Sequence, residues 1–202
     1  MVIDKTPQKS SNKPMSSQNS STELNNNNFL VITALGQDRP GLVASLTEAI
    51  TQQQCSICES QMSLLGGEFA IIMLVKGQWN NIAKLEQVLP SLQENLKILI
   101  QVKQTEQRAN LKSAIPYCVE VLALDNPGIV HQVTEFFFQR KINIHDMHTE
   151  SFNAAHTGTN MFALNMTIEI PTGIHIPGLR EDFLEFSDEL NLDSLIEPFK
   201  TH

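Results

Sequence analysis

Two short stretches of this chain carry the same residue types at the same spacing, and together they could bind an amino acid. Asp, Pro and Gly recur in both, 87 residues apart, each time between an apolar run and an amphipathic one. Glycine lets a ligand approach the backbone closely, and the N–H groups at the start of a helix attract a carboxylate. An Asp side chain accepts hydrogen bonds from an ammonium group. The candidate ligand-binding residues are Asp38, Arg39, Pro40, Gly41 and Leu42 in the first copy, and Asp125, Asn126, Pro127, Gly128 and Ile129 in the second.

A purely structural role competes with ligand binding at both aspartates. Asp is also a preferred helix N-cap, worth ~1 kcal/mol with no ligand involved, so Asp38 and Asp125 could act as cap, as ligand contact or as both. The copies differ where Arg39 is replaced by Asn126. Only the first copy therefore offers a guanidinium, which predicts the better carboxylate site there. Residues 56–59 and 143–146 are expected near these loops, either as further contacts or as plain surface strand.

The other reactive side chains form no catalytic or metal site that we can identify. Cys55 and Cys58 make one C-x-x-C on a predicted strand, whereas a redox pair usually begins a helix and a zinc site needs a second pair. His145 and His148 are three residues apart on a predicted strand, so we expect them on opposite faces. We therefore expect a protein that is not an enzyme, with no catalytic residues, metal or cofactor.

The elements that must position the two motifs repeat as well. The apolar periodicity predicts a strand, a helix, two strands, a helix and a strand in each half, which is the ferredoxin-like βαββαβ order with antiparallel sheets. The fold class is thus α+β. Pro90 is expected to kink or split its helix. We expect strands at about 29–35, 55–64, 68–76, 97–103, 117–123, 142–152, 160–170 and 192–199, and helices at about 41–53, 80–95, 128–141 and 178–190.

Composition sets the domain boundaries. Residues 1–28 are rich in Ser, Asn and Gln and should be a disordered tail, because they contain too little apolar surface to order. We expect a first module at 29–104, a polar linker at 105–116 and a second module at 117–199. No apolar run is long enough for a membrane span, and no signal peptide is recognisable. With three cysteines, this predicts a cytoplasmic protein.

Charge is concentrated in the second module. The chain has a net charge of −8, made up of +1 in residues 1–28, 0 in 29–116 and −9 in 117–202. Direct DNA or RNA binding requires a basic face, and none is visible. Three acidic residues of the last predicted helix, Glu181, Glu185 and Glu189, are the candidate partner-binding residues. They could attract a basic protein such as a DNA-binding regulator, or simply form a solvated helix face.

One predicted strand is apolar without interruption. Phe69–Val75 shows no alternation, although a strand with one wet face should alternate. Either a partner sheet or another chain covers the face away from the helices, or the strand is central in its own sheet and leaves a few apolar groups exposed. The first alternative predicts a homo-oligomer.

These motifs resemble the ACT domain. The first copy contains Asp-Arg-Pro-Gly-Leu-Val and, after a helix and a strand, Leu-Gly-Gly-Glu-Phe-Ala; the second contains Asp-Asn-Pro-Gly-Ile-Val and Ile-Asn-Ile-His-Asp-Met. Two such modules with no catalytic domain and an acidic second half resemble the glycine cleavage system transcriptional repressor family over about residues 29–199.

The resemblance implies a function and partners. It implies that the chain senses an amino acid, most simply glycine, at an interface between ACT modules. It also implies repression of the glycine cleavage operon through contact with a DNA-binding transcriptional regulator, without contact to the DNA. The alternative is an ACT-type ligand-binding regulatory subunit of a metabolic enzyme.

Overall fold

The computed structural model describes residues 27–106 and 114–199, and the chain divides into two compact units. Unit 1 comprises residues 1–108 and unit 2 comprises residues 109–202. The tail expected at 1–28 lies outside the described residues except for its last two positions, and most of the expected linker lies outside them too.

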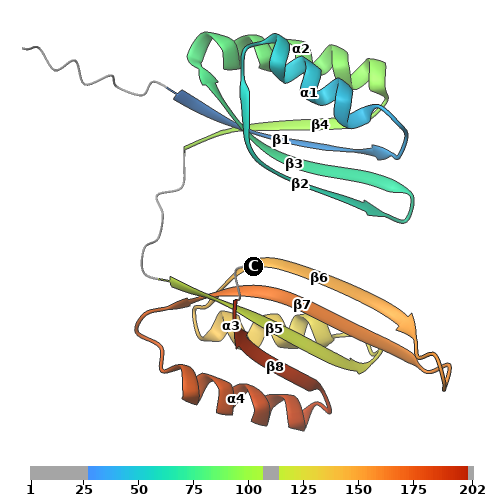
Figure 1. Cartoon of the computed structure of the whole chain (residues 1–202), viewed down its shortest axis with the longest axis vertical. Coiled ribbons are helices and arrows are strands. Elements are labelled where there is room, and N and C mark those ends of the chain that lie inside the picture. Colours follow the sequence, from blue (N-terminus) through green and yellow to red (C-terminus); the bar gives the residue numbers. More distant parts are fainter. Residues whose placement is uncertain (1–26, 107–113, 200–202) are drawn as a thin grey trace, which may run out of the picture. The chain divides into compact units, whose positions relative to one another are not determined.

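Unit 1 is one antiparallel sheet with two helices on one face (Figure 1). The strand order in the sheet is β2-β3-β1-β4, so the first and third strands are central. The elements are β1 Asn27–Gln37, α1 Leu42–Gln52, β2 Ser56–Leu65, β3 Glu68–Gln78, α2 Trp79–Leu96 and β4 Leu99–Thr105.

Unit 2 repeats this arrangement with the sheet order β6-β7-β5-β8. The expected α+β fold of two ferredoxin-like modules with antiparallel sheets is therefore confirmed. The elements are β5 Ala114–Leu124, α3 Ile129–Gln139, β6 Asn143–Asn153, β7 Asn160–Pro171, α4 Ile176–Glu189 and β8 Asp193–Pro198.

Each unit has its own core between the sheet and the helices. On β3 the side chains of Phe69, Ile71, Met73 and Val75 are buried, because alternate residues of a strand point to one face. The core of unit 2 is aromatic where α3 meets α4. There Phe183 is fully buried, with ring centroids 5.1 Å from Phe136 and 5.2 Å from Phe137.

Two local expectations need correction. Pro90, which is exposed, does not split its helix: α2 continues through it, and Ile82, Leu85 and Leu89 hold the helix on the sheet. β4 ends at Thr105, and β5 begins at residue 114. Both strands therefore extend into the expected linker. No helix within the described ranges is both long and apolar enough to cross a bilayer.

Candidate functional site

The two motifs form the turns that join the first strand of each unit to its first helix. Gly41 has φ 96° and ψ −9°, and Gly128 has φ 100° and ψ −11°, so the repeated sequence produces a repeated backbone geometry. A positive φ in this range favours glycine, because a Cβ would crowd the backbone. Turn geometry therefore accounts for both glycines, whether or not a ligand approaches them.

The N-cap role expected as an alternative for Asp38 and Asp125 is wrong. The N-caps are Gly41 and Gly128, and neither helix has a side-chain cap or an acidic residue in its first turn. The first N–H groups of α1 and α3 thus lack a side-chain acceptor, and the positive end of each helix dipole has no acidic side chain beside it. Such an end suits a bound carboxylate.

The aspartates are fixed through their main chains. The Asp38 N–H donates to the Gly67 carbonyl at 3.1 Å, and the Asp125 N–H donates to the Asn160 carbonyl at 3.0 Å. Both residues are exposed. The backbone of each aspartate is therefore anchored three residues before the glycine that begins the helix, and its exposed carboxylate could accept hydrogen bonds from an ammonium group.

Leu42 and Ile129 do not offer side chains to a ligand. They are only 2% and 6% exposed, and each belongs to the core of its unit. Each could contribute only its backbone N–H to a bound carboxylate. The residue after each glycine is apolar because it begins the buried stripe of a helix.

Arg39 has a structural partner that the sequence did not indicate. Its guanidinium donates to the carbonyl of Leu96, the last residue of α2. Basic side chains commonly bind the free carbonyls at a helix C-terminus. Arg39 therefore links the turn to the second helix, and Asn126 has no comparable bond to α4 among those recorded for the described residues. No local sequence signal could reveal this contact, because it spans 57 residues.

The segments expected beside the loops lie at the other end of each sheet. Ser56 pairs with Lys76, which pairs with Phe29 near the start of β1, whereas the turn follows Gln37 at the end of that strand. The separation is six to eight strand residues, roughly 20–27 Å. The same register holds in unit 2. Residues 56–59 and 143–146 therefore cannot contact the same ligand as the turn of their own unit.

The β2–β3 hairpin lies beside the first turn instead. Its tip is Gly66-Gly67, and both glycines have positive φ. In unit 2 the corresponding hairpin is longer, with a loop over residues 154–159 closed by the Ala154 N–H bonded to the Thr159 carbonyl at 2.9 Å. The five extra residues of the second copy are thus placed at the rim of the second turn, and the two candidate sites have different rims.

A bulge occurs at the same place in both edge strands, between Ile57 and Glu59 and between Ile144 and Asp146. It corrects the expectation that His145 and His148 face opposite sides. The His145 Nδ1 lies 3.6 Å from a Glu169 oxygen. His148 pairs with Asn165, which is four residues from Glu169 on β7 and points to the same face. The two histidines therefore share that face. No cluster of three metal-ligating side chains occurs in the described part of the chain.

In unit 1 the bulged residue is Cys58, which is exposed, whereas Cys55, just before β2, is buried. Burial raises the pKa of the Cys55 thiol. A raised pKa disfavours the thiolate, which is the reactive form. The C-x-x-C pair is thus divided between the core and the surface.

The acidic residues of α4 lie on its solvent side. Glu181, Glu185 and Glu189 are exposed, whereas Phe183 on the same helix is buried. Asp182 forms a salt bridge with Arg140 at 3.1 Å. The three candidate partner-binding carboxylates are therefore accessible. Their exposure fits both alternatives: a helix face that is simply solvated, and a surface that binds a basic partner.

Comparison with known proteins identifies the family. A family model for the ACT domain matches residues 28–103, which lie within unit 1. The glycine cleavage system transcriptional repressor of Escherichia coli (strain K12) is 31% identical over 173 residues, covering 86% of this chain and 91% of that protein. The repressor of Shigella flexneri matches with the same identity and coverage.

Two solved structures resemble the whole chain. One is a crystal structure assigned to the glycine cleavage system transcriptional repressors, with TM-score 0.69 and 27% identity over 87% of this chain and 99% of that one. The other, of a protein from Galdieria sulphuraria, has TM-score 0.72 over 86% of this chain and 99% of that one. It is 22% identical and shows the fold alone. With its tandem ACT fold and this identity to the E. coli protein, the chain belongs to the glycine cleavage system transcriptional repressor family.

Proposed function

We propose that this protein represses expression of the glycine cleavage system in response to an amino acid, and that it acts by contacting a DNA-binding regulator. Membership of the repressor family supports the regulatory role. The observation that carries the ligand response is the pair of turns in which a helix begins at a glycine with no side-chain cap. Each turn leaves N–H donors for a carboxylate beside an exposed aspartate.

The first turn is the proposed principal site, with glycine as its ligand. The carboxylate of glycine would bind the first N–H groups of α1, and its ammonium group would bind Asp38. A small ligand suits this arrangement, because Leu42 is turned into the core and adds no pocket wall. Arg39 bonds to Leu96, so its proposed contribution to carboxylate binding rests on its remaining N–H donors.

Contact with a protein rather than with DNA is supported by charge. The net charge is −8, and the strands of unit 2 contain no Lys or Arg. A phosphate backbone would be repelled by such a surface, whereas a basic protein would be attracted. The exposed carboxylates of α4 are the proposed contact.

Calorimetric titration of the purified chain with glycine tests the ligand proposal, with alanine and serine as competitors of increasing size. Asp38→Asn should weaken glycine binding about tenfold or more, because an amide cannot match a carboxylate as acceptor for an ammonium group. Asp188→Asn is the matched control, since it removes the same charge from an exposed site on α4.

The outcomes separate the proposed function from its alternative. Binding of a different amino acid would keep the sensor and remove the glycine assignment. Binding of none would contradict the sensor. Co-purification with a metabolic enzyme instead of a DNA-binding protein would identify a regulatory subunit of that enzyme.

A further inference from the structure

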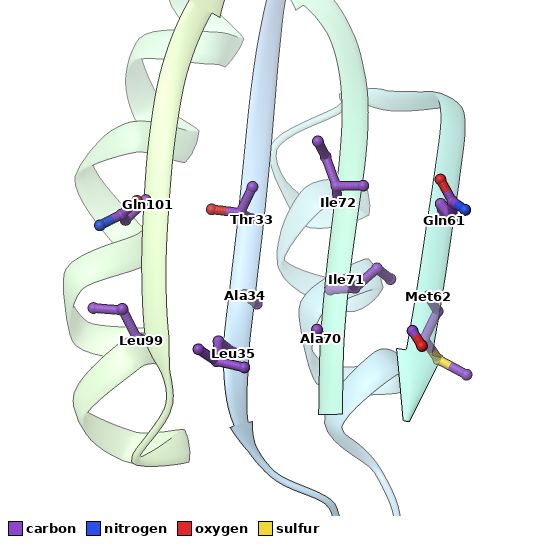
Figure 2. Close-up of a pocket in the computed structure, with 11 residues that line it drawn as sticks. Thr33, Ala34, Leu35, Gln61, Met62, Ala70, Ile71, Ile72, Leu99 and Gln101 are labelled. Carbon is purple, nitrogen blue, oxygen red and sulfur yellow. The ribbon is translucent and has the colours of Figure 1, made fainter. Parts of the chain in front are cut away.

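The sheet of unit 1 has an apolar face on the side away from α1 and α2, which we call the open face (Figure 2). On the central strand β3, Ala70, Ile72 and Leu74 alternate with the buried residues, and Ile72 is 48% exposed. The face is hollowed by about 410 Å³, and an adjoining hollow of about 310 Å³ shares Gln61 and Ile72 with it. Apolar surface gathered in the middle of a sheet is typical of an interaction site.

The register of the sheet arranges this face in rows, and the two rows through its apolar centre carry polar or charged groups at their ends; the outward charges of β3, Glu68 and Lys76, lie at the two ends of that strand. One row runs from Lys103 on β4 through Val31 and Leu74 to Glu59 on β2. It therefore places a cation at one edge, an anion at the other and two apolar side chains between them. Lys103 and Glu59 are both exposed.

The next row repeats the pattern with amides. It runs from Gln101 through Thr33 and Ile72 to Gln61, and Figure 2 shows these four side chains across the four strands. Each of these two rows thus has complementary groups at its two ends: a cation at one and an anion at the other, or two amides that can each donate and accept.

The ends of a row are too far apart to pair within one copy. Three strand spacings separate β4 from β2, which is roughly 14 Å. The salt bridges recorded among the described residues lie in unit 2 and do not include Lys103 or Glu59. Lys103 and Glu59 therefore cannot pair with each other across the sheet of their own unit.

A two-fold axis parallel to the strands satisfies both of these rows at once. Such an axis turns the open face of a second copy onto the first and exchanges the β2 and β4 edges while leaving each row at its own level. Lys103 then lies over Glu59 of the second copy, and Gln101 lies over its Gln61. The reciprocal contacts form by symmetry, and the apolar centres stack. This is the aligned packing of two sheets, about 10 Å apart.

We propose that a second copy of this chain covers the open face of unit 1, packed sheet on sheet about this axis. The corresponding face of unit 2 does not fit itself in this way. Apart from His145 and His148, the charged side chains at its outward positions are acidic, and a second identical face would repel it. Those acidic residues are Glu120, Asp146, Glu150, Glu169, Asp193 and Glu197.

Charge reversal at the row ends tests the proposal on the full chain by sedimentation velocity over a concentration series. Wild type should be a dimer. Lys103→Glu and Glu59→Lys should each raise the dissociation constant about tenfold or more, because each places like charges together twice in the dimer. The double variant should return to within about threefold of wild type, since it restores both pairs in reverse.

Two further variants complete the design. Ile72→Lys puts a charge in the apolar centre, and it should abolish the dimer. The matched control is Lys84→Glu, which makes the same charge change as Lys103→Glu at an exposed site on α2 and should leave the dimer intact. Far-ultraviolet circular dichroism checks that each variant is folded. A monomeric wild type, single reversals without effect, a double variant that stays dissociated, or a dimer that tolerates Ile72→Lys would each overturn the proposal.

Discussion

At the scale of single residues, the two turns depend on glycine for a reason that can be measured apart from ligand binding. Gly41 and Gly128 have φ near 100°, where an L-residue is strained. A Cβ added at either position would have no heavy atom within 4 Å among the surrounding groups. The cost of substitution is therefore one of backbone conformation alone, and it should be nearly the same in both units.

Gly41→Ala should lower the free energy of unfolding of unit 1 by about 1–2 kcal/mol, the cost of a left-handed backbone for an L-residue. Gly128→Ala should do the same in unit 2. Urea denaturation measures both. Gly173→Ala is the control, because Gly173 is also open to solvent but has no positive φ in the left-handed range, and it should change stability by less than about 0.5 kcal/mol. Equal effects at Gly41 and Gly173 would contradict the argument.

The sequence predicts the turns better than it predicts the roles of their residues. The repeated Asp, Pro and Gly locate both turns, because local backbone geometry depends on local residue types. Asp38 could cap α1 only if the helix began directly after it. The helix begins at Leu42 instead, so its N-cap is Gly41. The bond from Arg39 to Leu96 depends on how α2 ends beside the turn, which only the folded unit determines.

At the scale of elements, hydrophobic periodicity predicts every strand and helix, but not where pairing becomes irregular. A strand pattern alone places His145 and His148 on opposite faces, and one bulged residue in β6 brings them to the same face. The continuity of α2 through Pro90 has a similar cause. Local propensity argues for a break there, and three buried contacts with the sheet outweigh it.

The helix α4 divides its residues between a buried aromatic side and an exposed acidic side, so its charges can be reversed without disturbing the core. Reversing Glu185 and Glu189 to Lys should weaken co-purification of a basic partner by about tenfold, because four units of charge change at the proposed contact. The measurement is pull-down of the DNA-binding regulator by the full chain, at low and at physiological salt.

The control for α4 makes the same charge change in unit 1. Glu48 on α1 and Glu94 on α2 are both exposed, so Glu48→Lys with Glu94→Lys alters net charge equally at a different place. If that double variant weakens the partner as much, the effect comes from net charge. If neither variant weakens it, the acidic side of α4 is a solvated helix face.

At the scale of the whole molecule, the repeat has produced two cores that share no residue. The core cluster of unit 1 draws on its own strands and helices, and so does that of unit 2. A large cavity in one core therefore removes contacts from that unit alone. This separation allows the two modules to diverge, one toward an apolar open face and the other toward an acidic surface, while the fold of each is kept.

Phe183→Ala should destabilise unit 2 by about 3–5 kcal/mol, because it removes a fully buried ring from the aromatic cluster. Hydrogen exchange followed by mass spectrometry in mild urea should show faster exchange over residues 114–199, with residues 27–106 unchanged. Leu85→Ala, at a fully buried position of unit 1, should give the reverse pattern. Phe138→Ala removes a ring that is 72% exposed on α3 and should alter neither segment. If Phe183→Ala and Leu85→Ala each accelerate exchange across both segments equally, the two cores unfold as one cooperative unit, and the division into independent modules fails.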